Sequence, residues 1–521
     1  MSKIIENNSP EERISALETR ISELETLIKY YEEQLKLSKK KIFGSSSEKS
    51  AYDQLTIDGV FNEPEQIAAD GAKEPEPELE LVKEHYRKKR TRADSIPEDI
   101  PVEEILLKLP EEETVCPDCG GKMHVMGHET AREELVVIPA KVLLRRYVTC
   151  TYACRACERT SDHVPMKKSE APAPVIKGSF ASPEIVAYTA VQKYLMGLPL
   201  YRQEKDWERK DVLLSRQTMA NWLIKCSDDW LFPIWAELKR RLLLRDVLHA
   251  DETSIQVLRE PGKRAQSKSS MWHYRTSGDT DEPIVLMEYR PDKKAANPEH
   301  FLAGFSGYLH TDGAKGYHGL SENITPIGCW AHVRRRFDAA VKVIREADRA
   351  DSAAMKGKRY CDKLFAIERD LSELAPEERY SKRLELLKPV MDEFFLWVRA
   401  PGVKVTPEST FGKAIGYALS QQKYLRNVLL DGRLELSNNR AERTIKSFVI
   451  DRKNFLFANT PRGADASAVI FSLVETAKET RLDPFEYLTF VFRTAPGVDM
   501  ENPEAVQALL PSAYKQVPAS A

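Results

Sequence analysis

The chain has 521 residues, too many for one hydrophobic core, and this length predicts about three or four domains. A net charge of −2 excludes a uniformly basic nucleic-acid binder, so any DNA contact has to come from local patches. No apolar run reaches the ~18 residues of a membrane span, and residues 1–10 lack a signal-peptide core. We therefore expect a cytoplasmic protein without a membrane partner, whose eight cysteines are reduced.

Apolar residues recur in alternating steps of three and four along the first segment, residues 1–43. With Glu and Lys around them, they predict a coiled coil that pairs two copies of the chain. The same pattern also fits a single amphipathic helix packed on its own chain. Residues 44–110 lose this period, and their acidic, proline-rich stretch followed by the basic run Tyr86–Arg92 predicts a disordered linker. The heptad positions are Ile14, Leu17, Ile21, Leu24, Ile28, Tyr31 and Leu35.

Two Cys-x-x-Cys knuckles lie within residues 111–165, separated by the strand-like stretches Leu135–Ile138 and Val142–Val148. Paired knuckles joined by a hairpin supply four thiolates in tetrahedral spacing, which is typical of a structural zinc ribbon. Cys150 is a spare thiol that competes as a ligand, and His124 and His128 are weaker candidates. The predicted Zn²⁺ ligands are Cys116, Cys119, Cys154 and Cys157.

Residues 175–230 have helical patterning and resemble a helix-turn-helix DNA-binding domain. Ser182-Pro183 is a typical helix start, and Leu200–Arg209 and Ser215–Ser227 predict a second and a third helix. Many helical bundles share this spacing. Three residues of the third helix have side chains that read base edges, although they are equally ordinary on a protein surface: Arg216, Gln217 and Asn221.

Three acidic residues stand where carboxylates of a metal centre are expected. Asp251 ends a short apolar strand, and Asp312 ends another before Gly313, with strands predicted at Met271–Arg275 and Ile284–Tyr289 between them. Carboxylates at the ends of neighbouring strands, joined by one from a helix, suit two divalent ions roughly 3.5–4 Å apart that clamp a phosphoryl displacement. The helical member, near the start of its helix, is Glu442.

Each of these acids also has an ordinary structural explanation. Asp312 before a glycine fits a turn residue, and Glu442 three residues after Asn439 fits the return partner of a helix cap. Asp251 fits a strand end without any ligand. Their spacing alone therefore leaves the metal centre and these simpler roles open.

Six motifs taken together resemble the transposase family of insertion sequence 66. The resemblance extends upstream to the zinc knuckles, the basic run and Phe43-Gly44, so it covers nearly the whole chain. Two departures are Ala314 after the glycine, where the family more often has an aromatic residue, and Cys150-Thr151 before the second knuckle. The motifs are His249–Thr253, Thr311–Gly313, Gly328–Phe337, Asn438–Arg443, Arg452–Phe457 and Asp483–Leu488.

The resemblance implies an α/β ribonuclease-H-like catalytic core with a helical insertion, preceded by the coiled coil, the zinc ribbon and the helix-turn-helix domain. The catalytic residues and Mg²⁺ (or Mn²⁺) ligands it implies are Asp251, Asp312 and Glu442, with two ions per active site. The long gap before Glu442 requires an inserted segment. The core is then expected at 240–346 and 437–521, with the helical insertion at 347–436.

Cys329 and His332 match a Cys-x-x-His motif that follows the second aspartate in several related transposases. Two ligands do not close a zinc site, so packing beside the catalytic acids or a hold on scissile DNA is the favoured interpretation. Basic residues near the two helical motifs are expected to contact phosphate. They are Arg334, Arg335, Arg336, Arg443, Lys446, Arg452 and Lys453.

The expected function is DNA 3′-end cleavage and strand transfer of an insertion sequence, in a cytoplasmic, nucleoid-associated enzyme. The expected partners are transposon-end and target DNA, a second copy of the chain, and small accessory proteins of the same element. A sequence-specific DNA-binding regulator, or a catalytically idle domesticated transposase, is the alternative, because the zinc ribbon and helix-turn-helix suffice for it. The intact acidic triad favours the enzyme.

Overall fold

The computed structural model describes residue 28 and residues 142–153, 166–317, 319–400 and 406–514. It divides into two compact units, residues 73–171 and residues 1–72 with 172–521, which are treated separately here. The predicted coiled coil apart from Ile28, the linker and the four zinc ligands lie outside the described residues. No helix in the described ranges is long and apolar enough to cross a membrane.

The described part of the smaller unit contains an antiparallel pair of strands, β1 (Thr151–Ala153) and β2 (Met166–Lys168). Backbone and side chain of Ser169 both bond to the main chain of Cys150, which closes this pair. The strand predicted at Val142–Val148 is wrong, since these residues are irregular and mostly exposed. Apolar and β-branched composition favours a strand only where a partner strand covers it.

From residue 172 on, the larger unit contains the expected helices first, α4 (Pro183–Tyr194), α5 (Leu200–Glu208) and α6 (Arg216–Cys226). Serine side chains cap the first and third: Ser182 accepts a hydrogen bond from the Ile185 N–H, and Ser215 accepts one from Thr218. The predicted helix starts are therefore confirmed. A π-helical turn, η4 (Ser227–Leu231), then leads into α7 (Phe232–Leu242).

A five-stranded sheet forms the centre of this unit, with strand order β5-β4-β3-β6-β7. β3, β4 and β5 are antiparallel neighbours, whereas β3, β6 and β7 run parallel. The two strands predicted between the aspartates are confirmed as β4 and β5, each within a few residues of its expected bounds. The strands are β3 (Val247–Gln256), β4 (Lys268–Thr276), β5 (Val285–Arg290), β6 (Gly307–His310) and β7 (Ile324–Ile327), with α8 (Ala296–Phe301) and the 3₁₀ turn η5 (Lys315–Tyr317) between them.

Among the described residues after β7, the regular elements are helices joined by loops, as expected for the insertion and the end of the core. Before the last acidic motif lie α9 (Trp330–Val343), η6 (Glu346–Asp348), α10 (Ala353–Asp370), α11 (Pro376–Lys382), η7 (Arg383–Leu387), α12 (Lys388–Val398), α13 (Thr410–Arg426) and η8 (Asn427–Leu430). After it come α14 (Asn439–Phe455), α15 (Pro461–Glu479), α16 (Pro484–Thr494), η9 (Ala495–Gly497), α17 (Pro503–Ala508) and α18 (Pro511–Tyr514).

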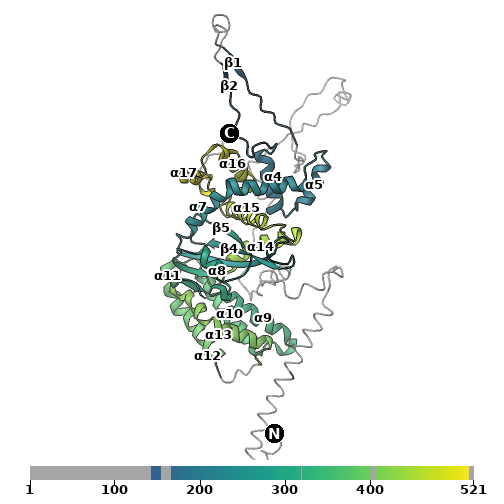
Figure 1. Cartoon of the computed structure of the whole chain (residues 1–521). Coiled ribbons are helices and arrows are strands. Elements are labelled where there is room, and N and C mark those ends of the chain that lie inside the picture. The colour runs from purple at the N-terminus through teal and green to yellow at the C-terminus, as the bar shows by residue number, and fades with distance from the viewer. Residues whose placement is uncertain (1–27, 29–141, 154–165, 318, 401–405, 515–521) are drawn as a thin grey trace, which may run out of the picture. The chain divides into compact units, whose positions relative to one another are not determined.

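Two hydrophobic clusters pack against the sheet. Successive residues of β3 enter different clusters: Leu248 and Ala250 join the first, and Val247 joins the second. The first is completed by α4, α6, α7, α15 and α16, and the second by α9, α10, α12 and α13. Figure 1 shows these two helical groups on opposite sides of the sheet. The insertion is thus an integral layer that covers one side.

Buried arginines fix the long helical segments to the core. Arg383, fully buried, pairs with Glu368 and donates to the carbonyls of Asp431 and Leu434, on the loop that leads to α14. Arg275 of β4 bonds both Thr444 of α14 and the carboxylate of Glu479. A buried cation requires several acceptors to offset its lost hydration, so these contacts define where α14 lies.

Candidate active site

Asp251 lies on β3, whereas Asp312 lies in a turn two residues beyond the parallel strand β6, which ends at His310 and so stops short of the aspartate expected at its end. The Cα partners of β3 and β6 include His249 and His310, and each aspartate lies two residues further along its chain. Because side chains on a strand alternate with a period of two, Asp251 belongs to the same face of the sheet as His249. The parallel pairing of β3 with β6 places the turn after β6 beside Asp251, and the carboxylates of Asp251 and Asp312 meet there.

A third acid, Glu252, joins this pair. Carboxylate oxygens of Asp251, Glu252 and Asp312 lie within 4.8 Å of one another. Asp251 is only 1 % exposed, and its Oδ2 atom has no hydrogen-bond partner among the described residues. We refer to these three residues as the strand carboxylate cluster.

Burial and mutual repulsion make this cluster electrostatically costly without a cation. Burial raises the pKa of Asp251 well above its ordinary value, and the charges of Asp312, Glu252 and Glu442 raise it further. Burial and Asp312 raise the pKa of Glu252 to about 8, although Lys293 and the Tyr317 hydroxyl oppose this. Such a group of acids is what a bound divalent ion stabilises.

The Asp312 turn is held by the helical insertion. Asp312 Oδ1 accepts the backbone N–H of Ala314 at 2.8 Å, so the predicted turn role is present beside the proposed metal role. Its carbonyl accepts the Tyr417 hydroxyl of α13 at 2.6 Å. Gly313 has φ +86°, and a Cβ there would lie 2.8 Å from Gln421 Oε1 and 3.0 Å from the Tyr417 hydroxyl. Only glycine fits this turn without strain.

A stacked histidine pair lies beneath the aspartates. The rings of His249 and His310 are parallel within 9°, with centroids 4.3 Å apart. Burial lowers the pKa of His249 to about 3 and that of His310 well below its usual range, so both rings are neutral. His310 Nε2 accepts the backbone N–H of Glu435 at 3.3 Å, which assigns its proton to Nδ1. Through the stacking and the hydrogen bonds to Asn438 and Glu435, the pair supports the backbone next to the aspartates.

Asn438 joins the helix-borne acid to the sheet. Its side-chain NH₂ donates to the Ala250 carbonyl at 2.9 Å, so its Oδ1 accepts the Nδ1–H of His249, also at 2.9 Å. Its backbone N–H donates to Cys329 Sγ at 3.2 Å. Asn438 immediately precedes α14 and is fully buried. It therefore ties the N-terminus of the helix that carries Glu442 to β3 and α9.

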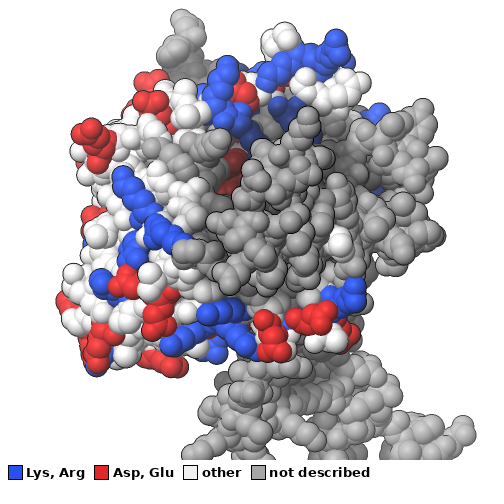
Figure 2. All heavy atoms as spheres, turned by 90° about the horizontal axis from the view of Figure 1, so that it is seen from below, with Lys and Arg blue, Asp and Glu red and all other residues white. Residues whose placement is uncertain are grey.

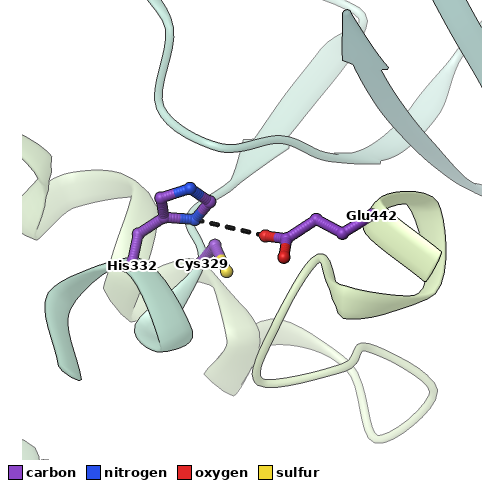
Figure 3. A group of neighbouring side chains, drawn as sticks. All are labelled: Cys329, His332 and Glu442. Atoms are coloured by element: carbon purple, nitrogen blue, oxygen red, sulfur yellow. Dashed lines mark ion pairs between the residues drawn. The ribbon is translucent and has the colours of Figure 1, made fainter. Parts of the chain in front are cut away.

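Glu442 does not act as the return partner of a helix cap. Its Oε1 accepts Arg335 Nη2 of α9 at 2.6 Å and lies 3.6 Å from His332 Nδ1. A carboxylate oxygen of Glu442, a ring nitrogen of His332 and Cys329 Sγ lie within 4.8 Å of one another. Figure 3 shows the three side chains converging from α9 and α14. The structure thus brings Asp251 and Asp312 together and places Glu442 in a neighbouring group.

The sequence did not indicate the place of three residues in the candidate site. Glu252 directly follows Asp251, and that acidic pair was its only signal. Arg335 was expected to contact phosphate, yet it pairs with Glu442. No local pattern marks Asn438 as a link to β3, because its partners lie 188 and 189 residues away in sequence.

The other predicted DNA contacts divide by exposure. Arg216, Gln217 and Asn221 are exposed on α6, and Gln217 bonds Asn221 at 3.0 Å. Arg334 instead pairs with Asp362 at 2.6 Å, and Arg336 lies 4.2 Å from the centre of the Tyr417 ring. The three arginines of α9 therefore already have protein partners, which the sequence did not indicate.

On α14, Arg443 and Lys453 are exposed and Lys446 is half-buried. Arg452 bonds the Ser254 carbonyl and so anchors the helix to β3. On the face drawn in Figure 2, the described Lys and Arg side chains are interspersed with Asp and Glu. This distribution agrees with the small net charge and confines any phosphate contact to local groups.

Family models match four parts of the chain. One described as "Transposase IS66 family" matches residues 178–466, more than half of the chain. A second, "zinc-finger binding domain of transposase IS66", matches residues 113–158, which contain all four predicted zinc ligands. "Transposase C of IS166 homeodomain" matches 30–105, and "IS66 C-terminal element" matches 472–512. These matches give the order of the domains as an N-terminal region, a zinc finger and a mixed α/β catalytic domain.

Curated relatives come from Sinorhizobium fredii (strain NBRC 101917 / NGR234). The uncharacterized protein y4qI is 32% identical over 420 residues, which cover 78% of this chain and 75% of that protein. The uncharacterized protein y4jD is 29% identical over 435 residues, covering 81% of each chain. The similarity therefore extends well beyond the acidic motifs.

Proposed function

The chain belongs to the IS66 transposase family, and on this premise we propose that it cleaves DNA at the 3′ ends of an insertion sequence and joins them to target DNA. Asp251, Asp312 and Glu442 are the proposed catalytic residues, and two Mg²⁺ or Mn²⁺ ions are the proposed metals. Glu252 is a further candidate ligand. The observation that carries the proposal is the strand carboxylate cluster, with its buried, unpartnered Asp251 oxygen.

The sheet supports a ribonuclease-H-like core. Three antiparallel strands are followed by two parallel ones; the first acid lies on the central strand β3, and the second follows the adjacent parallel strand β6. The third acid comes from α14, a helix anchored to β3 and β4 after the insertion. This arrangement allows carboxylates far apart in sequence to converge on one phosphate.

The residues present fit divalent ions, because hard carboxylate oxygens are what Mg²⁺ and Mn²⁺ prefer. Bound ions would activate the nucleophile and stabilise the charge on the phosphate.

The proposed reaction has two steps. In the first step, a water oxygen bonds to phosphorus while the P–O3′ bond breaks, and the leaving oxygen takes a proton. In the second, the new 3′ hydroxyl attacks a target phosphorus and displaces a target 3′ oxygen. Asp251 and Asp312 supply oxygens at fixed positions.

DNA recognition is proposed for the N-terminal half. The exposed base-reading side chains of α6 would enter the major groove, and Arg443, Lys446 and Lys453 would contact phosphate near the acids. The zinc finger and the coiled coil would add DNA contacts and pair two chains. We also propose that small accessory proteins of the same element take part in transposition.

The test compares cleavage with end binding. Asp312→Asn should lower Mg²⁺-dependent cleavage of element-end DNA by far more than the ~10–100-fold typical of a residue that only orients a ligand. Binding to the same DNA should persist, because the proposed recognition residues are elsewhere. Asp338→Asn, which removes the same charge from an ion pair with Lys342 on α9, is the control and should cleave normally. Full cleavage by Asp312→Asn would refute the assignment.

A further inference from the structure

We propose that Cys329, His332 and Glu442 form a binding site for one thiophilic divalent cation of the Zn²⁺ class. We refer to these residues as the α9–α14 site, and it is separate from both the strand carboxylate cluster and the zinc finger. No carboxylate of the strand cluster belongs to it, and each of its three side chains offers a ligand atom of a different kind, namely sulfur, nitrogen and oxygen.

The geometry fits a four-coordinate ion. Zinc bonds of ~2.0–2.3 Å place the ligands of a tetrahedral site ~3.3–3.8 Å apart. The distance from His332 Nδ1 to Glu442 Oε1 is 3.6 Å, within this range. All three ligand atoms lie within 4.8 Å of one another, so a small inward movement completes the site. Figure 3 shows the side chains directed at a common point.

The surroundings favour an ion rather than a chance contact. Cys329 and His332 are each 1 % exposed and Glu442 is 9 % exposed, so the site is shielded from water. Cys329 and His332 stand at the N-cap and in the first turn of α9, and this rigid spacing presents both ligands on one side. The Asn438 N–H donates to Cys329 Sγ, an outer contact that supports a thiolate ligand.

The donor set selects the metal. Thiolate and imidazole prefer Zn²⁺, whereas Mg²⁺ requires hard oxygen ligands and keeps several waters. Three protein ligands leave the fourth position for water. Arg335 now supplies the positive charge beside Glu442 at 2.6 Å, and its side chain is 26 % exposed. A bound ion would displace this guanidinium toward solvent.

Occupation would have a consequence for catalysis, and this part rests on the proposed function. Glu442 is the proposed third catalytic carboxylate, and a zinc ion bound to its Oε1 fixes this side chain toward Cys329 and His332. An ion in the α9–α14 site therefore restricts the movement by which Glu442 would join a metal held by Asp251 and Asp312. Zinc at this site is inhibitory.

Binding is tested on the full chain with Co²⁺ as the probe. After loosely held metal is dialysed away and the remaining zinc is measured, added Co²⁺ should give a thiolate-to-cobalt absorption band that saturates at about one equivalent. Cys329→Ser should lose the band, and Cys361→Ser, a buried cysteine on α10, should keep it. Serine can still accept the Asn438 N–H, and circular dichroism with the retained finger zinc verifies folding. A band that is absent from the wild type, or unchanged in Cys329→Ser, overturns the proposal.

Two arginine variants test whether Arg335 competes with the ion. Arg335→Gln should tighten Co²⁺ binding by about tenfold, because the competing charge is gone. Arg334→Gln, which removes the same charge one residue earlier, should change the Co²⁺ affinity much less, and equal effects would contradict direct competition.

The inhibitory role is tested by DNA cleavage. Zinc should inhibit wild-type cleavage in Mg²⁺, whereas Cys329→Ser, compared with its own zinc-free rate, should resist this inhibition. If zinc inhibits the wild type and Cys329→Ser to the same extent, the inhibition does not come from the α9–α14 site. A cobalt band with no cleavage in Mg²⁺ alone would refute the proposed function but leave the site intact.

Discussion

The strand-borne and the helix-borne acids of this protein are positioned by different means. The pairing of β3 with β6 ends at the stacked histidines His249 and His310; Asp251 follows on β3, and Asp312 is held in the turn after β6. Glu442 lies on α14, and its carboxylate is directed by side chains of α9. Backbone pairing in a sheet fixes the position of a strand residue relative to its neighbours. The direction of a side chain on a helix depends instead on the side chains that it contacts.

This difference indicates where the site is rigid and where it can switch. In the strand carboxylate cluster, Lys293 lies 3.9 Å from Glu252, farther than the 2.6 Å between Arg335 and Glu442. Glu442 already has its cation. We expect metal to be recruited first by the strands, with Glu442 joining only when Arg335 releases it.

Gly313→Ala should have the largest effect, since it disturbs the rigid part. The added Cβ would meet Gln421 and Tyr417 and adopt a disfavoured φ, so the Asp312 turn must move. A displacement near 1 Å is expected to lower cleavage by about a hundredfold. Gly304→Ala is the matched control, because Gly304 has φ +88° but open space around its Cβ position. If the two variants cleave DNA equally well, the turn is not fixed as tightly as the comparison requires.

Asn438→Ala should weaken the helix-borne part and have an intermediate effect. It leaves the buried Ala250 carbonyl and His249 without their partner, at a cost of ~1–3 kcal/mol that a lower thermal midpoint would report. With α14 less well held, cleavage should fall about tenfold, and more Mn²⁺ should be needed for half-maximal rate. Asn439→Ala, the adjacent amide, is the control. A normal metal requirement in Asn438→Ala would show that Glu442 is positioned without this link.

Asp451→Asn should have the smallest effect and should not depend on metal. Burial and the nearby Glu475 raise the pKa of Asp451 to about 6, above its ordinary 3.8. Because the folded pKa is the higher one, this group's contribution to stability falls as the pH rises from about 4 to about 6 and stays low above that.

Removing the Asp451 charge should therefore stabilise the protein at pH 7 by roughly 1 kcal/mol, allowing for solvent screening, and change little near pH 4. Thermal unfolding with and without Mg²⁺ measures this, with the exposed Asp351→Asn as control. If Asp451→Asn raises the thermal stability only when Mg²⁺ is present, the prediction is wrong. The raised pKa of Asp451 would then reflect metal binding outside the strand carboxylate cluster and the α9–α14 site.

Much of the larger unit was predictable from local sequence. Ser182-Pro183 and Ser215 mark helix starts because their side chains satisfy the first free N–H groups, a contact within three residues. The strands β4 and β5 follow from their apolar composition. Val142–Val148 shows the limit of such reasoning, since its composition favours a strand that has no partner among the described residues.

The sequence by itself identified the family and the candidate residues of the site, because carboxylate, thiol and imidazole are properties of single side chains and the motifs are those of the family. That the carboxylates of Asp251 and Asp312 meet depends on the parallel pairing of β3 with β6, which the tertiary structure decides. Only the tertiary structure decided that Glu252 joins them and that Glu442 turns toward Arg335, His332 and Cys329. The contacts of Glu442 join segments 107 residues or more apart, and their geometry depends on how α9 and α14 pack beside the sheet.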